Sequence, residues 1–290
     1  MAFWIFTDAC SDLSRQYIDA QHHLTVVPLS YLIDGETVYS DGNESETLHF
    51  YKQLKLGKLV TTSMITCEAW QNAMRPALEA EHDVLCVVFS SALSGTYASC
   101  MMAADNLAAA YPERKIAVVD TLSASLGEGM LVDMAIHCRD REGKDVDQTS
   151  AWIEKQKMQV AQWFTVDDLV YLKRGGRLSA TSAYLGGMMR IKPIMHVDEN
   201  GKLVPMEKVS GRKRSLRLLI EKIKELSESE IAEQTIYISH GDCEAEALWM
   251  ADLIKAELRV KEIVIGVIGP IIGTHAGPGT IAVFFMGRHR

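Results

Sequence analysis

Hydroxyl side chains and a glycine stand at a point of the chain where they could bind an anion. Ser94, Gly95 and Thr96 follow the apolar run of residues 84–89, which predicts a buried strand, and they precede a segment with apolar residues at helical spacing. The first turn of a helix has unpaired N–H groups and a partial positive charge, which favour an anion. Gly95 would let a ligand approach the backbone. The alternative is that Ser94 or Thr96 simply caps the helix.

Two further stretches offer similar chemistry. Residues 60–66 form a predicted hydroxyl-rich loop that includes Thr62 and Ser63. Residues 269–279 are rich in glycine and carry Thr274 and His275, so backbone N–H groups and side chains together could receive an oxyanion. A plain connector between two strands is the alternative for this loop. It lacks the Lys-Ser/Thr ending of a phosphate-binding P-loop.

Several other chemistries lack their sequence signatures. Ser94 is not in a Gly-x-Ser-x-Gly elbow, and no Gly-x-Gly-x-x-Gly follows the first predicted strand. Adjacent His22 and His23 are poorly spaced for one metal, and His240 with Asp242 make an incomplete ligand set. We therefore expect no metal and no cofactor.

Composition narrows the class of protein. The net charge of -8 argues against a nucleic-acid-binding surface. None of the six cysteines form a CxxC pair, so we expect reduced thiols in an intracellular protein. No apolar run is long enough for a membrane span, and the N-terminal apolar residues are too few for a signal peptide. These features predict a cytoplasmic protein.

The elements that must position these residues fall into two halves. Strands and helices alternate up to about residue 160, with strands predicted over residues 3–7, 24–30, 84–89 and 116–119. This pattern predicts an α/β domain with a doubly wound, mainly parallel sheet over residues 1–160. Ligands bind such sheets outside the carboxyl ends of the strands, so the loops at Asp8, Thr62, Ser94 and Thr121 should approach one edge.

Residues 161–290 mix hairpins with helices and predict a second, α+β domain. Residues 191–209 read as a hairpin, residues 173–179 as a tight basic turn, and residues 179–188 as a helix that Ser179 can cap. Asp34-Gly35 in the first half predicts another hairpin turn.

Five motifs along the chain resemble those of one protein family. They are Thr7-Asp8 with Asp12-Leu13, Thr62-Ser63, residues 90–97, residues 172–179 and residues 273–279. In this order they resemble the DegV family of bacterial fatty-acid-binding proteins, which includes the binding subunits of fatty acid kinase.

The resemblance implies a single acyl chain buried between the two domains. Its carboxylate would be held by Thr62, Ser63 and Ser94, near His275. It also implies that the protein is not itself an enzyme and that a separate kinase subunit phosphorylates the bound carboxylate. Three positions depart from the family pattern: Ala9, Met64-Ile65 and Ser210.

We therefore expect a carrier that presents a long-chain fatty acid to a kinase. Ligand contacts are expected from Thr62, Ser63, Ser94, Gly95, Thr96, Arg174, Thr274 and His275. Docking of the kinase is expected at Lys173, Arg177, Arg212 and Lys213, because these basic clusters break an acidic chain. The rivals are a hydrolase or acyltransferase that uses Ser94 with His275, and a domain that binds a different small acid.

Overall fold

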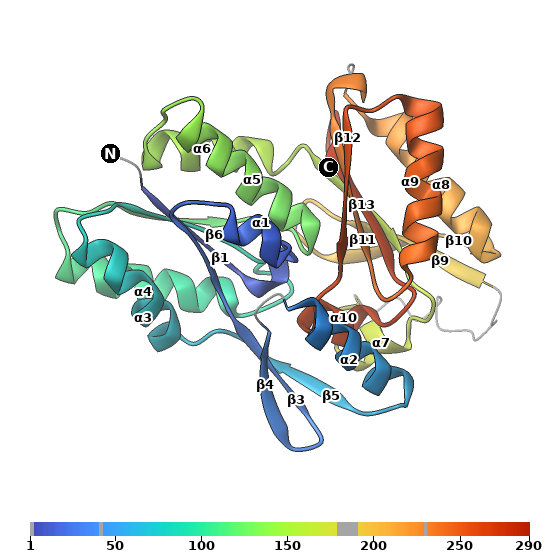
Figure 1. Ribbon diagram of the computed structural model, residues 1–290, viewed down its shortest axis with the longest axis horizontal. Helices are drawn as coiled ribbons and strands as arrows, with labels where there is room; N and C mark the ends of the chain where they lie inside the picture. The colour runs from blue at the N-terminus through green and yellow to red at the C-terminus, as the bar shows by residue number, and fades with distance from the viewer. Residues whose placement is uncertain (1–2, 41–42, 179–190, 229–230) are drawn as a thin grey trace.

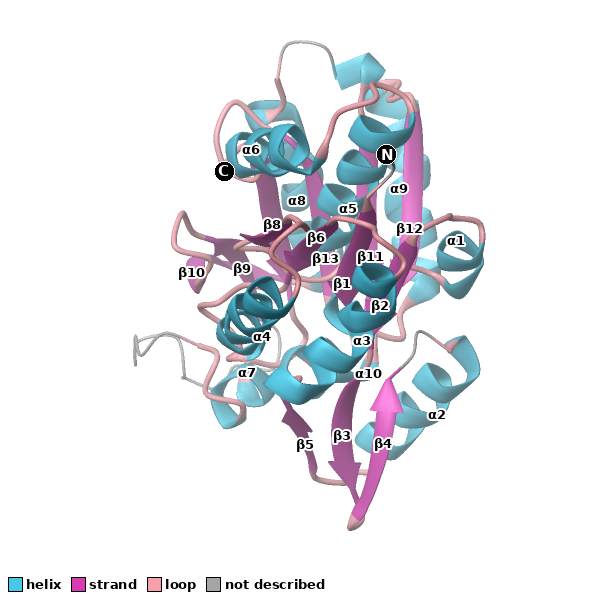
Figure 2. Ribbon diagram, turned by 90° about the vertical axis from the view of Figure 1, so that its left-hand side faces the viewer, coloured by secondary structure: helices cyan, strands magenta, loops and turns pink. Residues whose placement is uncertain are grey.

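The computed structural model describes residues 3–40, 43–178, 191–228 and 231–290, and the strands of this part of the chain form three sheets (Figure 1). A four-stranded sheet lies in the first half of the chain and a six-stranded sheet in the second. A small three-stranded sheet projects from the first half (Figure 2). The helices α1 (Arg15–Asp19) and α2 (Glu44–Lys55) belong to the first half as well.

The four-stranded sheet is parallel throughout, as predicted. Its order is β2-β1-β6-β7, with β1 at Trp4–Asp8, β2 at Leu24–Val27, β6 at Val84–Val88 and β7 at Ile116–Asp120. Helices α3 (Cys67–Glu79) and α4 (Thr96–Ala110) cover one face, and α5 (Leu126–Asp140) and α6 (Val146–Gln156) cover the other (Figure 1). Helices on both faces are the doubly wound arrangement, and they leave the carboxyl ends of the strands open to loops.

The six-stranded sheet is mixed, with the order β10-β9-β8-β13-β11-β12. Its strands are β8 (Val160–Thr165), β9 (Ile191–Val197), β10 (Leu203–Ser210), β11 (Thr235–His240), β12 (Glu262–Val267) and β13 (Ile281–Met286). Only β11 and β12 pair in parallel among the strands described, which fits the predicted α+β class. Helices α8 (Arg212–Leu226) and α9 (Glu244–Leu258) pack on this sheet. The exact domain boundary near residue 160 stays a prediction.

Helix α5 joins the two halves, because it contacts β1 and β6 of the parallel sheet and also β11 and β13 of the mixed sheet. Its sequence allows this position, since residues on several sides of the helix are apolar and buried, including Leu126, Met130, Leu131 and Ile136. A helix that is apolar on more than one side packs between two layers.

The three-stranded sheet corrects two predictions. The strand expected over residues 24–30 is divided at Pro28, which has no N–H to donate, into β2 and β3 (Leu29–Ile33) of different sheets. Residues 60–63 were expected in a loop but form strand β5 (Val60–Ser63), which pairs with β3. The hairpin of β3 with β4 (Glu36–Ser40) is confirmed, with positive φ at Asp34 (52°) and Gly35 (84°).

The glycine-rich stretch near the end of the chain is also not the loop that we expected. Most of it is helix α10 (Pro270–Ala276), which begins with proline at a favourable first-turn position. Gly277 ends it with φ at 81°. Helix α10 packs beside the short helix α7 (Val170–Arg174). The helix predicted over residues 179–188 lies outside the described residues.

Candidate functional site

A cavity of about 270 Å³ lies where the three sheets approach one another. Its wall is largely aliphatic and aromatic, and each sheet contributes to it. The parallel sheet contributes through the loops after β6 and β7, the small sheet through β3 and β5, and the mixed sheet through β8 and β13. The apolar and aromatic residues that line it are Leu29, Met64, Phe89, Leu93, Ala124, Trp163, Phe164, Leu172, Val197, Leu203, Ile268, Ile271, Ile272, Ala276, Ala282 and Phe284.

Thr62, His275 and Arg177 come together on this wall from three separate elements. Thr62 Oγ1 and His275 Nε2 are 2.8 Å apart and share a hydrogen bond between β5 and α10. Arg177 follows α7, and its Nε donates to the carbonyl of Leu93 at 3.1 Å. The short turn at Gly175 permits this assembly, because a Cβ there would lie 2.1 Å from His275 Nδ1. All three side chains are half-buried.

Ser94 lies on the same wall, in the turn between β6 and α4. Its hydroxyl is 2.9 Å from Thr96 Oγ1 and accepts the N–H of Thr96 at 3.2 Å. Gly95 stands at the start of α4, close under Met64, where a Cβ would lie 2.5 Å from the sulfur atom. The strand-to-helix turn predicted from the sequence therefore does reach the cavity.

The electrostatics of the site favour an anion. Arg177 is the only acidic or basic side chain among the described lining residues besides His275. Burial, together with the charge of Arg177, lowers the pKa of His275 to about 4, so this imidazole is neutral near pH 7. The lining therefore offers one guanidinium, several hydroxyls and a neutral imidazole to a ligand.

The structure brings together five of the eight predicted ligand-contact residues. Thr62, Ser63, Ser94, Gly95 and His275 line the cavity. The other three have different surroundings. Thr96 is buried against Ser94, Thr274 donates to the carbonyl of Pro270 at 2.7 Å within α10, and Arg174 is exposed beside the ring of Tyr171.

Of the two arginines in the basic turn of residues 173–179, the one that faces the cavity is not the one that we expected at the ligand. Arg177 was expected on the docking surface, but it lines the cavity, whereas Arg174 was expected at the ligand and points to solvent. Gln162, Phe164 and Phe284 also line the cavity and were not predicted. A period of two along β8 and β13 is the signal that could have placed them on one face of a sheet.

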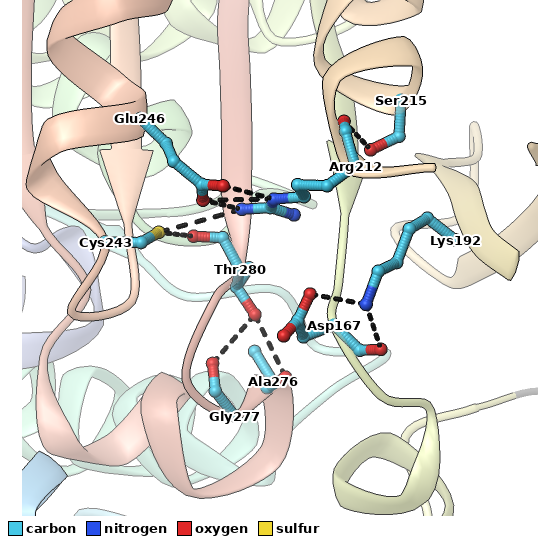
Figure 3. A network of polar contacts seen from close by, with 9 residues as sticks. All are labelled: Asp167, Lys192, Arg212, Ser215, Cys243, Glu246, Ala276, Gly277 and Thr280. Carbon is cyan, nitrogen blue, oxygen red and sulfur yellow. Dashed lines mark hydrogen bonds and ion pairs between the residues drawn. The ribbon is translucent and has the colours of Figure 1, made fainter. Parts of the chain in front are cut away.

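The other predicted docking residues differ in their surroundings. Lys173 and Lys213 are exposed. Arg212, at the start of α8, is tied to Glu246 of α9 by Nη2 at 2.6 Å and by Nε at 3.0 and 3.1 Å (Figure 3). The helix dipole disfavours a cation at the start of a helix, and the ion pair with Glu246 compensates for the position of Arg212 there. Arg212 therefore joins two helices and is less available to a partner than the two lysines.

Asp8 and Thr121, which were expected at the ligand edge, do not line the cavity. Asp8 is buried and accepts the N–H groups of Cys10 at 2.9 Å and Phe89 at 3.0 Å, so it holds the end of β1 to the turn after β6. Burial raises its pKa to about 6. Burial likewise raises the pKa of Asp12 to about 7 and that of Glu128 well above its usual value.

Of these three carboxyl groups, Asp12 lines a second cavity of about 300 Å³, which holds none of the predicted ligand-contact residues. Ser125 lines the first cavity and donates to Asp12, so this hydrogen bond stands between the two cavities. No group of three or more His, Cys, Asp or Glu in the described ranges is arranged to hold a metal ion.

Comparison with known proteins places the chain in a family. The profile described as "Uncharacterised protein, DegV family" matches residues 2–288. The chain belongs to the DegV family. A DegV domain-containing protein of Clostridium perfringens is 38% identical over 98% of this chain and 97% of its own length. Both matches extend over nearly the whole chain, including the two halves and the five motifs that suggested the resemblance.

Two solved DegV structures share this fold at full length. A DegV lipid-binding protein from Thermotoga maritima has a TM-score of 0.88 and 26% identity, and the match covers 100% of both chains. A fatty-acid-binding DegV family protein from Streptococcus agalactiae has a TM-score of 0.86 and 29% identity, again over 100% of both chains. Among the described residues, this DegV chain has no helix that is both long and apolar enough to cross a membrane.

Proposed function

We propose that this DegV protein binds one long-chain fatty acid, with the acyl chain in the apolar cavity and the carboxylate at Thr62, Ser94 and Arg177. The observation that carries the proposal is the composition of the wall, which is largely apolar and has one guanidinium, a group of hydroxyls, the His275 imidazole and the Gln162 amide. Related DegV proteins described as lipid-binding and fatty-acid-binding support it.

The energetics of such a ligand fit this wall. Burial of an acyl chain contributes about 0.8 kcal/mol per methylene group. The carboxylate loses its water on entry, and this loss opposes binding unless hydrogen bonds replace the water. Hydroxyl groups and the guanidinium of Arg177 can donate those bonds, and the neutral His275 can hold the Thr62 hydroxyl in place.

We further propose that the protein is a carrier that presents the carboxylate to a separate kinase for acyl-phosphate formation. Exposed Lys173 lies on α7, four residues before Arg177 of the carboxylate site. Exposed Lys213 at the start of α8 adds a second cation. An acidic surface on a kinase would be attracted to both, which mainly raises the rate of association.

The hydrolase alternative has less support from the geometry. Ser94 is hydrogen-bonded to Thr96, and His275 is hydrogen-bonded to Thr62. A serine nucleophile needs its base within hydrogen-bond reach and a third group that orients that base. The Nδ1 atom of His275 has no hydrogen-bond partner among the described residues, so no orienting group is in place there.

The test is a direct titration of delipidated protein with octadecanoic acid and with its methyl ester. The two compounds share the acyl chain and differ in the anionic headgroup. A hydrogen bond to a charged group is worth about 1.5–3 kcal/mol, so the acid should bind at least ten times more tightly. Equal affinity for the two compounds, or no binding of either, would contradict the proposal.

A further inference from the structure

Gln162 is a polar side chain in an apolar part of the cavity wall. It lies in the middle of β8, opposite Phe284 of β13, and its side chain shares a face of the sheet with Phe164. Both phenylalanines line the cavity, as does Gln162 itself. Gln162 is only 1% exposed.

Half of the Gln162 amide has no hydrogen-bond partner among the described residues. Its Oε1 accepts the hydroxyl of Ser123 at 2.9 Å, whereas its Nε2 has no acceptor. An unpaired polar atom at a site this buried is unfavourable unless a ligand supplies the missing group.

The neighbouring polar side chains of the wall are paired within the protein. Ser125 donates to Asp12 and lies 2.8 Å from Ser239 Oγ. Thr280 donates to the carbonyls of Ala276 at 3.0 Å and Gly277 at 2.9 Å (Figure 3). Of the described lining residues beyond the carboxylate site, Trp163 also has a buried polar atom without a partner, its Nε1, but its ring packs against His196 and Lys222. Gln162 is therefore the unpaired amide of this part of the wall.

Under the proposed function, Gln162 would lie beside the acyl chain and not at its carboxylate. Strand β8 ends at Thr165, which pairs with Ile281 shortly after α10 and precedes α7. These two helices carry or adjoin His275 and Arg177. Gln162 is three residues back along the strand, which corresponds to roughly 10 Å.

We propose that Gln162 forms a second polar subsite that takes a hydroxyl group in the middle of the acyl chain. This inference rests on the proposed function and names a substrate class for it: mid-chain hydroxylated fatty acids. A hydroxyl both donates and accepts, so it pairs with whichever half of the amide faces the cavity. A plain saturated chain leaves that half unpaired.

The test compares the affinities of 10-hydroxyoctadecanoic, 12-hydroxyoctadecanoic, cis-9-octadecenoic and octadecanoic acids for delipidated protein. The wild type should prefer one hydroxy acid over octadecanoic acid, and Gln162→Met should reduce that preference about five- to tenfold. Phe164→Leu, two residues along the same face, is the matched control. It should change the affinities for the hydroxy acid and the plain acid together.

The outcomes separate the subsite from the proposed function. Two outcomes reject the subsite and leave fatty-acid binding intact, provided that octadecanoic acid binds. In the first, Gln162→Met keeps the preference for the hydroxy acid. In the second, Gln162→Met loses a preference for the cis-alkene instead. If no acid binds to the wild type, both fail. Should Gln162→Met not fold, the wild type alone decides: equal affinity for both hydroxy isomers and octadecanoic acid rejects the subsite.

Discussion

Thr62 Oγ1 and His275 Nε2 meet at 2.8 Å, although 213 residues of chain separate them. This hydrogen bond joins the small sheet to α10 at the wall of the cavity. The low pKa of His275, about 4, leaves the imidazole neutral near pH 7, so it holds the Thr62 hydroxyl without adding a second cation to Arg177. The proposed carboxylate site thus has one permanent charge and an oriented hydroxyl.

The pKa of His275 predicts how the stability of the ligand-free protein depends on pH. The value falls from 6.5 to about 4 on folding, so between these values the unfolded chain binds more protons than the folded one. The contribution of His275 is therefore full above about pH 6.5 and is lost as the pH falls toward 4. At about pH 5 the stability lost through His275, relative to pH 7, should be roughly 1–2 kcal/mol.

Urea unfolding of the wild type and His275→Asn at about pH 5 and pH 7 measures this difference. Asp8 and Asp12 have raised pKa values and contribute in the opposite direction, but they are present in both proteins and cancel in the comparison. The variant should lose less stability than the wild type on acidification. The same loss in both proteins would show that His275 does not carry a lowered pKa.

Ser94→Ala should weaken the binding of octadecanoic acid by tens of fold while the fold is retained. Loss of a hydrogen bond to a charged group costs about 1.5–3 kcal/mol. Ser91→Ala is the control in the same turn, because Ser91 is exposed and its bond to Asp120 uses the backbone N–H. Unchanged affinity in Ser94→Ala, measured by titration, would remove Ser94 from the carboxylate site.

Gly175→Ala should displace His275 and weaken fatty-acid binding. Its Cβ would stand 2.1 Å from His275 Nδ1, so the imidazole must move and its bond to Thr62 is disturbed. Gly176→Asn is the control, because a Cβ there meets nothing within 4 Å and asparagine tolerates the φ of 69°. Equal binding by the two variants would mean that the close approach at Gly175 does not matter.

Lys173→Glu together with Lys213→Glu should slow acyl-phosphate formation with a cognate kinase and leave fatty-acid binding unchanged. Both lysines are exposed, so their effect acts on association and weakens as salt is added. Lys155→Glu is a suitable control, since Lys155 is also exposed but lies on α6 of the first half. Equal turnover by the charge variants and the wild type across ionic strength would exclude a docking role for these lysines.

The fold could be predicted from the sequence where local patterns coincide with the final structure. The apolar run before Ser94 and the helical spacing after it fix a strand-to-helix turn, and that turn lies at the cavity. The stretch around His275 was predicted as a loop because it is rich in glycine. It is instead a helix that begins at Pro270, and this helix packs beside α7, a contact that the local sequence does not show.

Side-chain direction was harder to predict than element type. Arg174 and Arg177 lie in one basic turn, and only the end of α7 and the turn at Gly175 and Gly176 decide which of them faces the cavity. The wall residue Gln162 comes from β8, whose cavity-facing side is set by pairing with β13 more than a hundred residues later. The period of two in a strand places Gln162 and Phe164 on one face, but no local pattern shows that this face lines the cavity.

Mass spectrometry of the organic extract from natively purified protein tests the central claim most directly. We expect a long-chain fatty acid in near-stoichiometric amount. Ser94→Ala purified in the same way should carry much less, while Ser91→Ala should carry as much as the wild type. Reproducible absence of any fatty acid from the wild-type extract, together with no binding on titration, would contradict the account.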